Sequence, residues 1–224
     1  MHYVLHYGQI MPYLPYLAGG MLISLALSIL SFAGGMVLGL IFAILRNDGH
    51  PIASRLVRIY VAFFTNTPQL VQIYVIYFGL PDFGILFSPF AAVLIGMTLN
   101  AAAYLCEILR AGLGSVHAQE LDAAESLGMN QLQTLRHVTL PHLFRVTMPA
   151  LTNQYILMTL GTSMAAIFGV EELTGRAFNI NSTTFRSIEI FTMVAGLYVI
   201  VTFIATILLS LFGRWAFRAR VPVL

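Results

Sequence analysis

A predominantly apolar, uncharged stretch from Met21 to Leu45 constrains this chain more than any other feature of its sequence. A helix that crosses the hydrocarbon core of a bilayer needs ~20 apolar residues, and this stretch is long enough. The whole chain agrees with it, because only 9% of the residues are charged and the mean hydropathy is +0.85. A soluble globular domain carries about 25% charged residues. The composition therefore excludes a soluble enzyme, a disordered protein and a nucleic-acid-binding protein, and it indicates an integral membrane protein.

Further apolar segments predict an all-α membrane domain with five transmembrane helices. We expect the spans at about residues 21–45, 66–80, 89–109, 149–170 and 189–212. The second span is too short to cross alone, so we expect it to begin before the Thr67-Pro68 step, with the proline kinking it. Residues 1–16 would then form an external segment, residues 17–214 the transmembrane domain and residues 215–224 a cytoplasmic tail.

The distribution of arginine predicts the orientation of these spans. With the N-terminus outside, nine of the eleven arginines fall on the cytoplasmic side, and only Arg176 and Arg186 fall outside. Cytoplasmic loops carry an excess of basic residues, so the N-terminus is predicted outside and the C-terminus inside. The C-terminal group of Arg214, Arg218 and Arg220 suits a position at the inner face.

Residues 52–64 are predicted to form an amphipathic helix that lies at the membrane interface. Arg55 and Arg58 interrupt a set of apolar residues that recur at helical spacing, namely Ile52, Leu56, Ile59, Tyr60 and Phe63. An ordinary connecting loop with scattered apolar residues is the alternative.

The polar region between the third and fourth spans is expected to face the cytosol. Its segment Glu120–Gly128 predicts a short helix, with acids in the first turns, where the helix dipole favours them, and a glycine suited to a left-handed terminus. The small side chains of Ala123 and Ala124 would let a partner approach closely. A second short helix, Gln131–Val138, is expected to end at Leu140-Pro141. Such short helices have little to pack against within one chain, so we expect this region to dock into another protein.

These segments, in this order, resemble the permeases of ATP-binding-cassette importers. The loop sequence Asp122-Ala-Ala-Glu-Ser-Leu-Gly128, followed by Leu140-Pro141, is similar to the signature of their membrane subunits. The similarity extends from about Leu17 to Arg214. Other segments resemble the polar amino-acid branch, which includes histidine, glutamine, glutamate, arginine and opine permeases: Thr65-Asn-Thr-Pro-Gln-Leu-Val-Gln-Ile-Tyr74, Tyr77-Phe-Gly-Leu-Pro81, Ala103-Tyr-Leu-Cys-Glu-Ile-Leu-Arg-Ala-Gly112, Pro149-Ala-Leu-Thr-Asn153 and Thr162-Ser163.

This resemblance implies the type I importer fold, assembled as a homodimer or with a sister permease, in a bacterial cytoplasmic (inner) membrane. Separate ATPase subunits would bind ATP and Mg, and a solute-binding protein would deliver a polar amino acid to the outer face. This chain would hold no cofactor, in agreement with a sequence that lacks lysine and therefore lacks a phosphate-binding loop. The coupling loop would be residues 115–141, and the residues gripped by the ATPase would be Glu120, Asp122, Ala123, Ala124, Glu125, Gly128, Leu140 and Pro141.

The sequence departs from the family pattern at three places. Asp122 stands where the family usually has glutamate, which keeps the charge. His117-Ala-Gln-Glu120 replaces the usual Pro-x-Gly-Gln entry to the coupling helix. Gly161 occupies the place where many members have a Lys-Asp pair before Thr162-Ser163, which removes two charges near the expected pathway.

Polar side chains at hydrocarbon depth are candidates for the substrate pathway, because amides and hydroxyls can replace the hydration of an amino acid without adding net charge. Hydrogen bonding between helices is the alternative role. Glu107 is counted as the one acid inside the spans, and it either serves the pathway or pairs with Arg110 one turn away. The candidates are Gln72, Asn100, Tyr104, Glu107, Asn153, Thr162 and Ser163, with Gln154 beside them.

No metal site is predicted. His137 and His142 are the closest histidine pair of the loop, but their spacing of five takes them off a shared helical face, and Pro141 lies between them. Two other functions stay open beside transport driven by a partner ATPase. One is a passive channel, and the other is a membrane-embedded enzyme, which would need several ionisable groups converging at depth.

Overall fold

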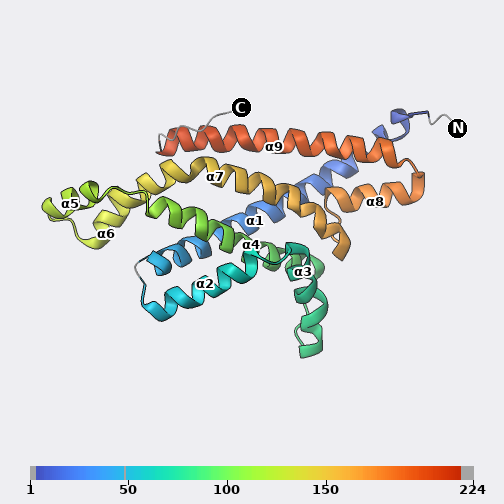
Figure 1. Cartoon of the computed structure of the whole chain (residues 1–224). Helices are drawn as coiled ribbons and strands as arrows, with labels where there is room; N and C mark the ends of the chain where they lie inside the picture. The colour runs from blue at the N-terminus through green and yellow to red at the C-terminus, as the bar shows by residue number, and fades with distance from the viewer. Residues whose placement is uncertain (1–3, 48, 218–224) are drawn as a thin grey trace.

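The computed structural model describes residues 4–47 and 49–217, and every regular element in that part of the chain is helical (Figure 1). Arg218, Arg220 and most of the predicted tail lie outside the described residues. Four long helices run side by side and form the bundle: α1 (Leu14–Asn47), α4 (Pro89–Leu113), α7 (Leu140–Gly161) and α9 (Ser187–Phe217). Short 3-10 turns, Tyr7–Gln9 and Met11–Tyr13, precede α1.

Three segments of the described chain are long and apolar enough to cross a membrane, namely Tyr7–Asn47, Pro89–Leu113 and Ser187–Phe217. Each of them contains one of the predicted spans, 21–45, 89–109 and 189–212, and extends beyond it. A fourth follows if Gln131–Phe168 and Leu173–Thr184, which meet at a bend of 47°, count as one broken span. The predicted second span is not among them, because its helical pieces are short. The chain is thus an all-helical, multi-pass membrane protein within its described residues.

The most extensive contact joins α1 to α4, and small residues make it possible. Gly35 and Gly39 lie against Ala101 and against the backbone around Ala102 and Cys106, all buried. Because no Cβ intervenes, the two helix backbones approach closely. The core at this end of the bundle also includes Leu105 and Leu109 of α4 and Leu143 of α7.

Alanine at Gly35 is expected to destabilise the protein by about 1–3 kcal/mol, because overpacking forces the helices apart. Its Cβ would lie only 2.6 Å from the Cβ of Ala101. Gly196→Ala in α9 is the matched control, since nothing lies within 4 Å of the position its Cβ would take. Thermal unfolding in detergent measures both variants. Equal unfolding temperatures would show that the α1–α4 contact is not tight.

The predicted amphipathic helix is present as α2 (Pro51–Thr65), but it packs on the bundle through a face other than the one the periodicity singled out. Val57 and Val61 are buried against α1 and α4. Of the predicted apolar stripe, Ile52, Leu56, Ile59 and Phe63 are 57–65% exposed, whereas Tyr60 is half-buried against the core. The chain itself therefore leaves most of this stripe uncovered.

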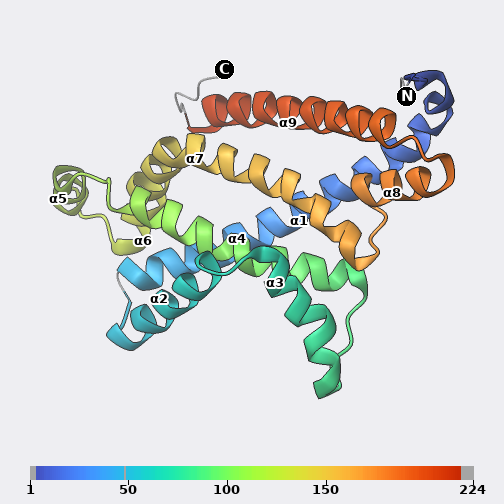
Figure 2. The ribbon, with the colours of Figure 1, turned by 45° about the vertical axis from the view of Figure 1, so that its right-hand side comes forward.

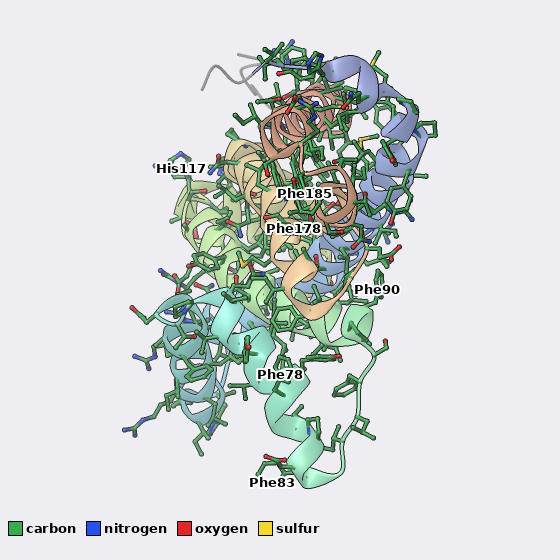
Figure 3. The ribbon with its side chains drawn as sticks, turned by 90° about the vertical axis from the view of Figure 1, so that its right-hand side faces the viewer. Phe78, Phe83, Phe90, His117, Phe178 and Phe185 are labelled. Carbon is green, nitrogen blue, oxygen red and sulfur yellow. The ribbon has the colours of Figure 1, made fainter. Side chains whose placement is uncertain are left out.

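After a break at residues 66–68, the chain forms an arm that projects from the bundle (Figure 2). The arm contains α3 (Gln69–Tyr74), a π-helical turn (Val75–Gly79) and a 3-10 turn (Leu80–Phe83). Phe83, at its tip, is 80% exposed (Figure 3). The second span was expected to begin before Thr67-Pro68 and to be kinked by the proline. Instead the helix is interrupted there, because Pro68 has extended backbone and α3 begins at the next residue.

One sequence-based expectation about the polar loop is wrong: Leu140-Pro141 does not end the second short helix. Helix α6 (Gln131–Thr134) continues through a π-helical turn (Leu135–Thr139) into α7, so the chain stays helical from Gln131 to Gly161. Pro141 cannot donate a backbone hydrogen bond, and the π turn directly before it adjusts the helix to that loss. Pro149, where the fourth span was expected to begin, lies inside α7.

The two ends of the bundle differ in their elements. Helix α5 (Ala118–Ser126) and α6 lie at one end with the last turns of α9, as both views show. The N-terminal turns and α8 (Leu173–Thr184) lie at the other end, beside the start of α9. A 3-10 segment (Thr162–Phe168) joins α7 to the loop before α8.

Candidate functional site

A polar cavity of ≈ 480 Å³ lies at the break between α2 and α3, with α4 and α7 as its other walls. Cavities of about 300–1,000 Å³ are typical of small-molecule sites. Apolar lining comes from Pro68, Leu157 and Met158. The polar lining consists of Thr65, Asn66, Thr67, Gln69, Asn100, Tyr104 and Gln154.

The break that forms one wall is stabilised by its own side chains. Thr65, Asn66 and Thr67 each donate to the carbonyl four residues earlier, at 2.7, 2.8 and 2.8 Å. The bond from Thr67 satisfies the Phe63 carbonyl in the last turn of α2, where a helix end leaves carbonyls without backbone partners. The Ala62 carbonyl accepts from both the side chain and the backbone of Asn66. Pro68 cannot continue the helix, so the chain turns there and exposes the wall to the cavity.

A pair of buried amides fixes this wall against α4. Gln72 donates to the Phe64 carbonyl at 2.9 Å and to the Thr67 carbonyl at 3.0 Å. Asn100 donates to Gln72 Oε1 at 3.0 Å and reaches the Phe64 carbonyl at 3.3 Å. Gln72 therefore acts as the interhelical link that the sequence left open as an alternative, while Asn100 both links the helices and lines the cavity.

Tyr60 of α2, which precedes the break along the chain, attaches the same wall to α4. Its hydroxyl donates to the Leu99 carbonyl at 2.7 Å. Burial, and to a smaller extent the nearby Cys106, raises the pKa of Tyr60 to about 12. The hydroxyl therefore keeps its proton and remains a donor at neutral pH.

The structure brings together only part of the predicted pathway. Asn100, Tyr104 and Gln154 line the cavity, and Gln72 lies directly behind its wall. Asn153 is exposed and is not among the described residues of the lining. Thr162 is fully buried and donates to the Thr159 carbonyl, while Ser163 donates to the Leu160 carbonyl. None of these three residues is in the lining, to which α7 contributes Gln154, Leu157 and Met158.

Four polar residues of the lining were not singled out as pathway candidates from the sequence: Thr65, Asn66, Thr67 and Gln69. The sequence did carry a signal, because all four belong to the Thr65–Tyr74 segment that resembles the amino-acid permeases. They were passed over because they were placed at or beside the start of the predicted span 66–80, whereas in the structure α2 ends at Thr65 and α3 begins at Gln69, so all four lie at or beside a break between helices.

Glu107 lies on α4 one helical turn beyond Tyr104, and two arginines hold its carboxylate. Arg110 donates to Oε2 at 2.9 and 3.1 Å, which is the pairing that the sequence suggested. Arg46 of α1 binds Oε1, an interaction that the sequence did not indicate. Glu107 is therefore committed to an ion-pair cluster between α1 and α4.

The predicted coupling residues from Glu120 to Gly128 lie in a hairpin of α5 and α6 at one end of the bundle, and Leu140 and Pro141 lie at the start of α7. Gly128 ends α5 with a left-handed backbone, φ +72°, as its glycine predicted. Asn130 then begins α6 with a reciprocal capping box, which it forms with Gln133 at 2.8 and 2.9 Å. The hairpin encloses a second cavity of ≈ 440 Å³ against the start of α7.

The hairpin exposes its leucines and buries one of its alanines. Leu127 and Leu132 are 80% and 73% exposed, and Leu121 is 40% exposed. Ala124, which was expected to face a partner, is only 2% exposed, because α5 packs it against its own chain. Asp122, Ala123 and Glu125 are exposed, Glu120 lies 3.5 Å from His142, and Leu140 and Pro141 are half-buried in the helix that follows.

Two buried acids at the opposite end were missed, so the expectation that Glu107 is the one acid inside the spans is wrong. Glu189, at the first residue of the predicted fifth span, is fully buried and accepts from the backbone of His6 at 3.0 Å. Glu172 is also fully buried, and it accepts from Ser24 and Tyr198 at 3.0 Å and from the Gly175 backbone at 2.8 Å. Glu172 thus ties α1 and α9 to the first turn of α8.

Comparison with known proteins places these features in one family. Residues 35–222 match the family of the "binding-protein-dependent transport system inner membrane component". The glutamine transport system permease protein GlnP of Escherichia coli K12 is 35% identical over 93% of this chain and 96% of its own length. The probable amino-acid permease protein YxeN of Bacillus subtilis is 35% identical over 89% and 91%.

Solved structures agree with the sequence relatives. A crystal structure of an amino acid ABC transporter with histidines matches with a TM-score of 0.86 and 31% identity, over 95% of this chain and 99% of that one. The inward-facing MetNI methionine ABC transporter shares the fold, with a TM-score of 0.75 at 22% identity over 91% and 97% of the two chains. Family membership implies ATPase and substrate-binding partners. The chain therefore belongs to the family of inner membrane components of binding-protein-dependent transport systems, and it is a permease subunit of an ATP-binding-cassette importer, not an enzyme.

Proposed function

We propose that this permease subunit carries a polar amino acid inward across a bacterial cytoplasmic membrane. The observation that carries the proposal is the polar cavity at the α2–α3 break, which offers amides and hydroxyls from three parts of the fold. Such groups can replace the hydration of a zwitterion as it leaves water. The printed names of the relatives, which include glutamine and octopine permeases, support a polar amino acid as the cargo.

In the membrane arrangement that we propose, the chain crosses the membrane five times, with the N-terminus outside and the C-terminus inside. The arginines support it, because Arg46, Arg110 and Arg145 lie toward the end of the bundle that carries the α5–α6 hairpin. The exposed apolar stripe of α2 suits a helix at the lipid interface. The uncovered arm after Pro68 suits contact with a second permease, either another copy of this chain or a homologue.

ATP hydrolysis, with its Mg, would take place in separate ATPase subunits docked on the α5–α6 hairpin. The exposed Leu121, Leu127 and Leu132 support this interface, because apolar side chains at a tip far from the bundle core gain from burial in a partner groove. Closure of the ATPase pair would then move the hairpin and the helices joined to it. An extracytoplasmic solute-binding protein would deliver the amino acid at the opposite end, and this chain itself would bind no cofactor and no nucleic acid.

Reconstitution tests this function directly. The chain is placed in proteoliposomes with its cognate ATPase subunit and solute-binding protein, and ATPase rate and labelled uptake are measured against a panel of amino acids. We expect a polar amino acid to stimulate ATP hydrolysis and to accumulate only when ATP is present. Flux without ATP would indicate a passive channel, and chemical conversion of the amino acid would indicate a membrane-embedded enzyme; either result overturns the proposal.

A further inference from the structure

The lining of the cavity at the α2–α3 break is polar but carries no charge. Among the described residues that line it there is no carboxylate, guanidinium or imidazole group. The nearest acid along α4, Glu107, lies outside the lining, and Arg46 and Arg110 engage both of its oxygens. A ligand that enters the cavity therefore meets dipoles and no counter-charge.

Two amides of the lining stand apart from the others. The side chains of Thr65, Asn66, Thr67 and Asn100 all donate hydrogen bonds within the protein. Gln69 and Gln154, in contrast, form no side-chain hydrogen bond among residues 4–47 and 49–217. Since a carboxamide both donates and accepts, two unengaged carboxamides can pair reciprocally with an uncharged polar group.

Gly161 leaves space beside one of these amides. A Cβ at Gly161 would lie 3.4 Å from Gln69 Oε1, so the glycine backbone passes next to the cavity wall without adding a side chain. Gly161, which stands where many family members have a Lys-Asp pair, thus borders Gln69. No fixed charge from this part of α7 acts on the cavity.

Resting on the proposed function, we propose that this cavity selects amino acids whose side chain is polar and uncharged, and that Gln69 and Gln154 recognise that side chain. The α-carboxylate and α-ammonium of a zwitterion offset each other, so such a ligand brings no net charge into the cavity. A charged side chain would lose its hydration there without meeting an opposite charge. A side-chain carboxamide can satisfy both unengaged glutamines.

The experiment measures binding to the purified permease–ATPase complex without the solute-binding protein, because that protein has a selectivity of its own. Glutamine, glutamate and arginine are titrated calorimetrically. Glutamine and glutamate have nearly the same shape, so their difference reports charge. We expect glutamine to bind at least about tenfold more tightly than glutamate or arginine. Equal affinities for the three would overturn the proposal.

Gln154→Glu introduces a carboxylate of the same shape into the lining. We expect it to raise the ratio of arginine to glutamine affinity by about tenfold or more. Gln9→Glu, the same substitution at an exposed site far from the cavity, should leave that ratio unchanged. If both variants change the affinity ratio alike, Gln154 does not contact the ligand side chain.

If the wild-type complex binds none of the three amino acids while ATP-driven amino-acid uptake is intact, the inference fails and the proposed function stands. If uptake is also absent, the proposed function fails.

Discussion

Replacing Glu172 with alanine is expected to lower the free energy of unfolding by roughly 3 kcal/mol or more, because three donors around a fully buried carboxylate lose their acceptor together. Ser24 comes from α1, Tyr198 from α9 and the Gly175 backbone from α8, and each lies within 3.0 Å of the carboxylate. Water cannot replace the carboxylate easily, since Glu172 is fully buried. Thermal or denaturant unfolding of the detergent-purified chain measures the effect.

The adjacent residue provides the matched control for this prediction. Glu171 is exposed, and its carboxylate accepts from Tyr16 at 3.4 Å and from Asn179 at 3.3 Å. The bond from Arg176 goes to the Glu171 backbone carbonyl, which alanine retains. Glu171→Ala should therefore change stability by less than about 1 kcal/mol. Glu172→Gln retains one acceptor oxygen and should fall between the two. If the two alanine variants unfold alike, the carboxylate of Glu172 does not hold the three helices together.

Valine at Gly128 is expected to reduce ATP-driven uptake by at least about tenfold while the protein still inserts in the membrane. At φ +72° a β-branched L-residue is strained by about 1–2 kcal/mol. The strain is relieved by unwinding the end of α5, where Gly128 donates to the Glu125 carbonyl at 2.8 Å and Met129 donates to the Ala124 carbonyl at 3.0 Å. Labelled uptake in proteoliposomes that contain the ATPase subunit measures the loss.

Asparagine at the same position separates backbone strain from simple bulk. Nothing lies within 4 Å of the position a Cβ would take at Gly128, and asparagine tolerates left-handed backbone. Gly128→Asn should therefore retain most of the uptake. If the valine variant takes up substrate at the wild-type rate, the end of α5 has no coupling role. If both variants lose uptake equally, the role belongs to the surface shape at this position and not to the backbone conformation.

Hydropathy and local rules predicted the elements whose structure depends on neighbouring residues. The long apolar stretches became α1, α4 and α9, and the helical spacing after Pro51 became α2. Gly128 ended its helix in the left-handed region, and Glu107 paired with Arg110. In each case, the residues responsible lie within one or two helical turns of each other, so the sequence alone contains the necessary information.

The features that the sequence did not predict depend on contacts between distant segments. Glu172 is buried because Ser24 and Tyr198 approach it from helices far away in the chain. Ala124 is buried because α5 packs against α6 and the π-helical turn that follows it, so its small size serves packing within the chain. Pro141 continues a helix that local rules would end, because the π turn before it changes the hydrogen-bonding register.

The uninterrupted helix that begins at Gln131 has a mechanical consequence. At 1.5 Å per residue, Gln154 lies about 35 Å along this rod from the hairpin that begins it. No loop between the two points absorbs a displacement, so a tilt imposed at the hairpin also shifts Gln154 relative to Gln69. Movement of the α5–α6 hairpin would then change the cavity at the α2–α3 break directly, with the helix rotating about its π turn.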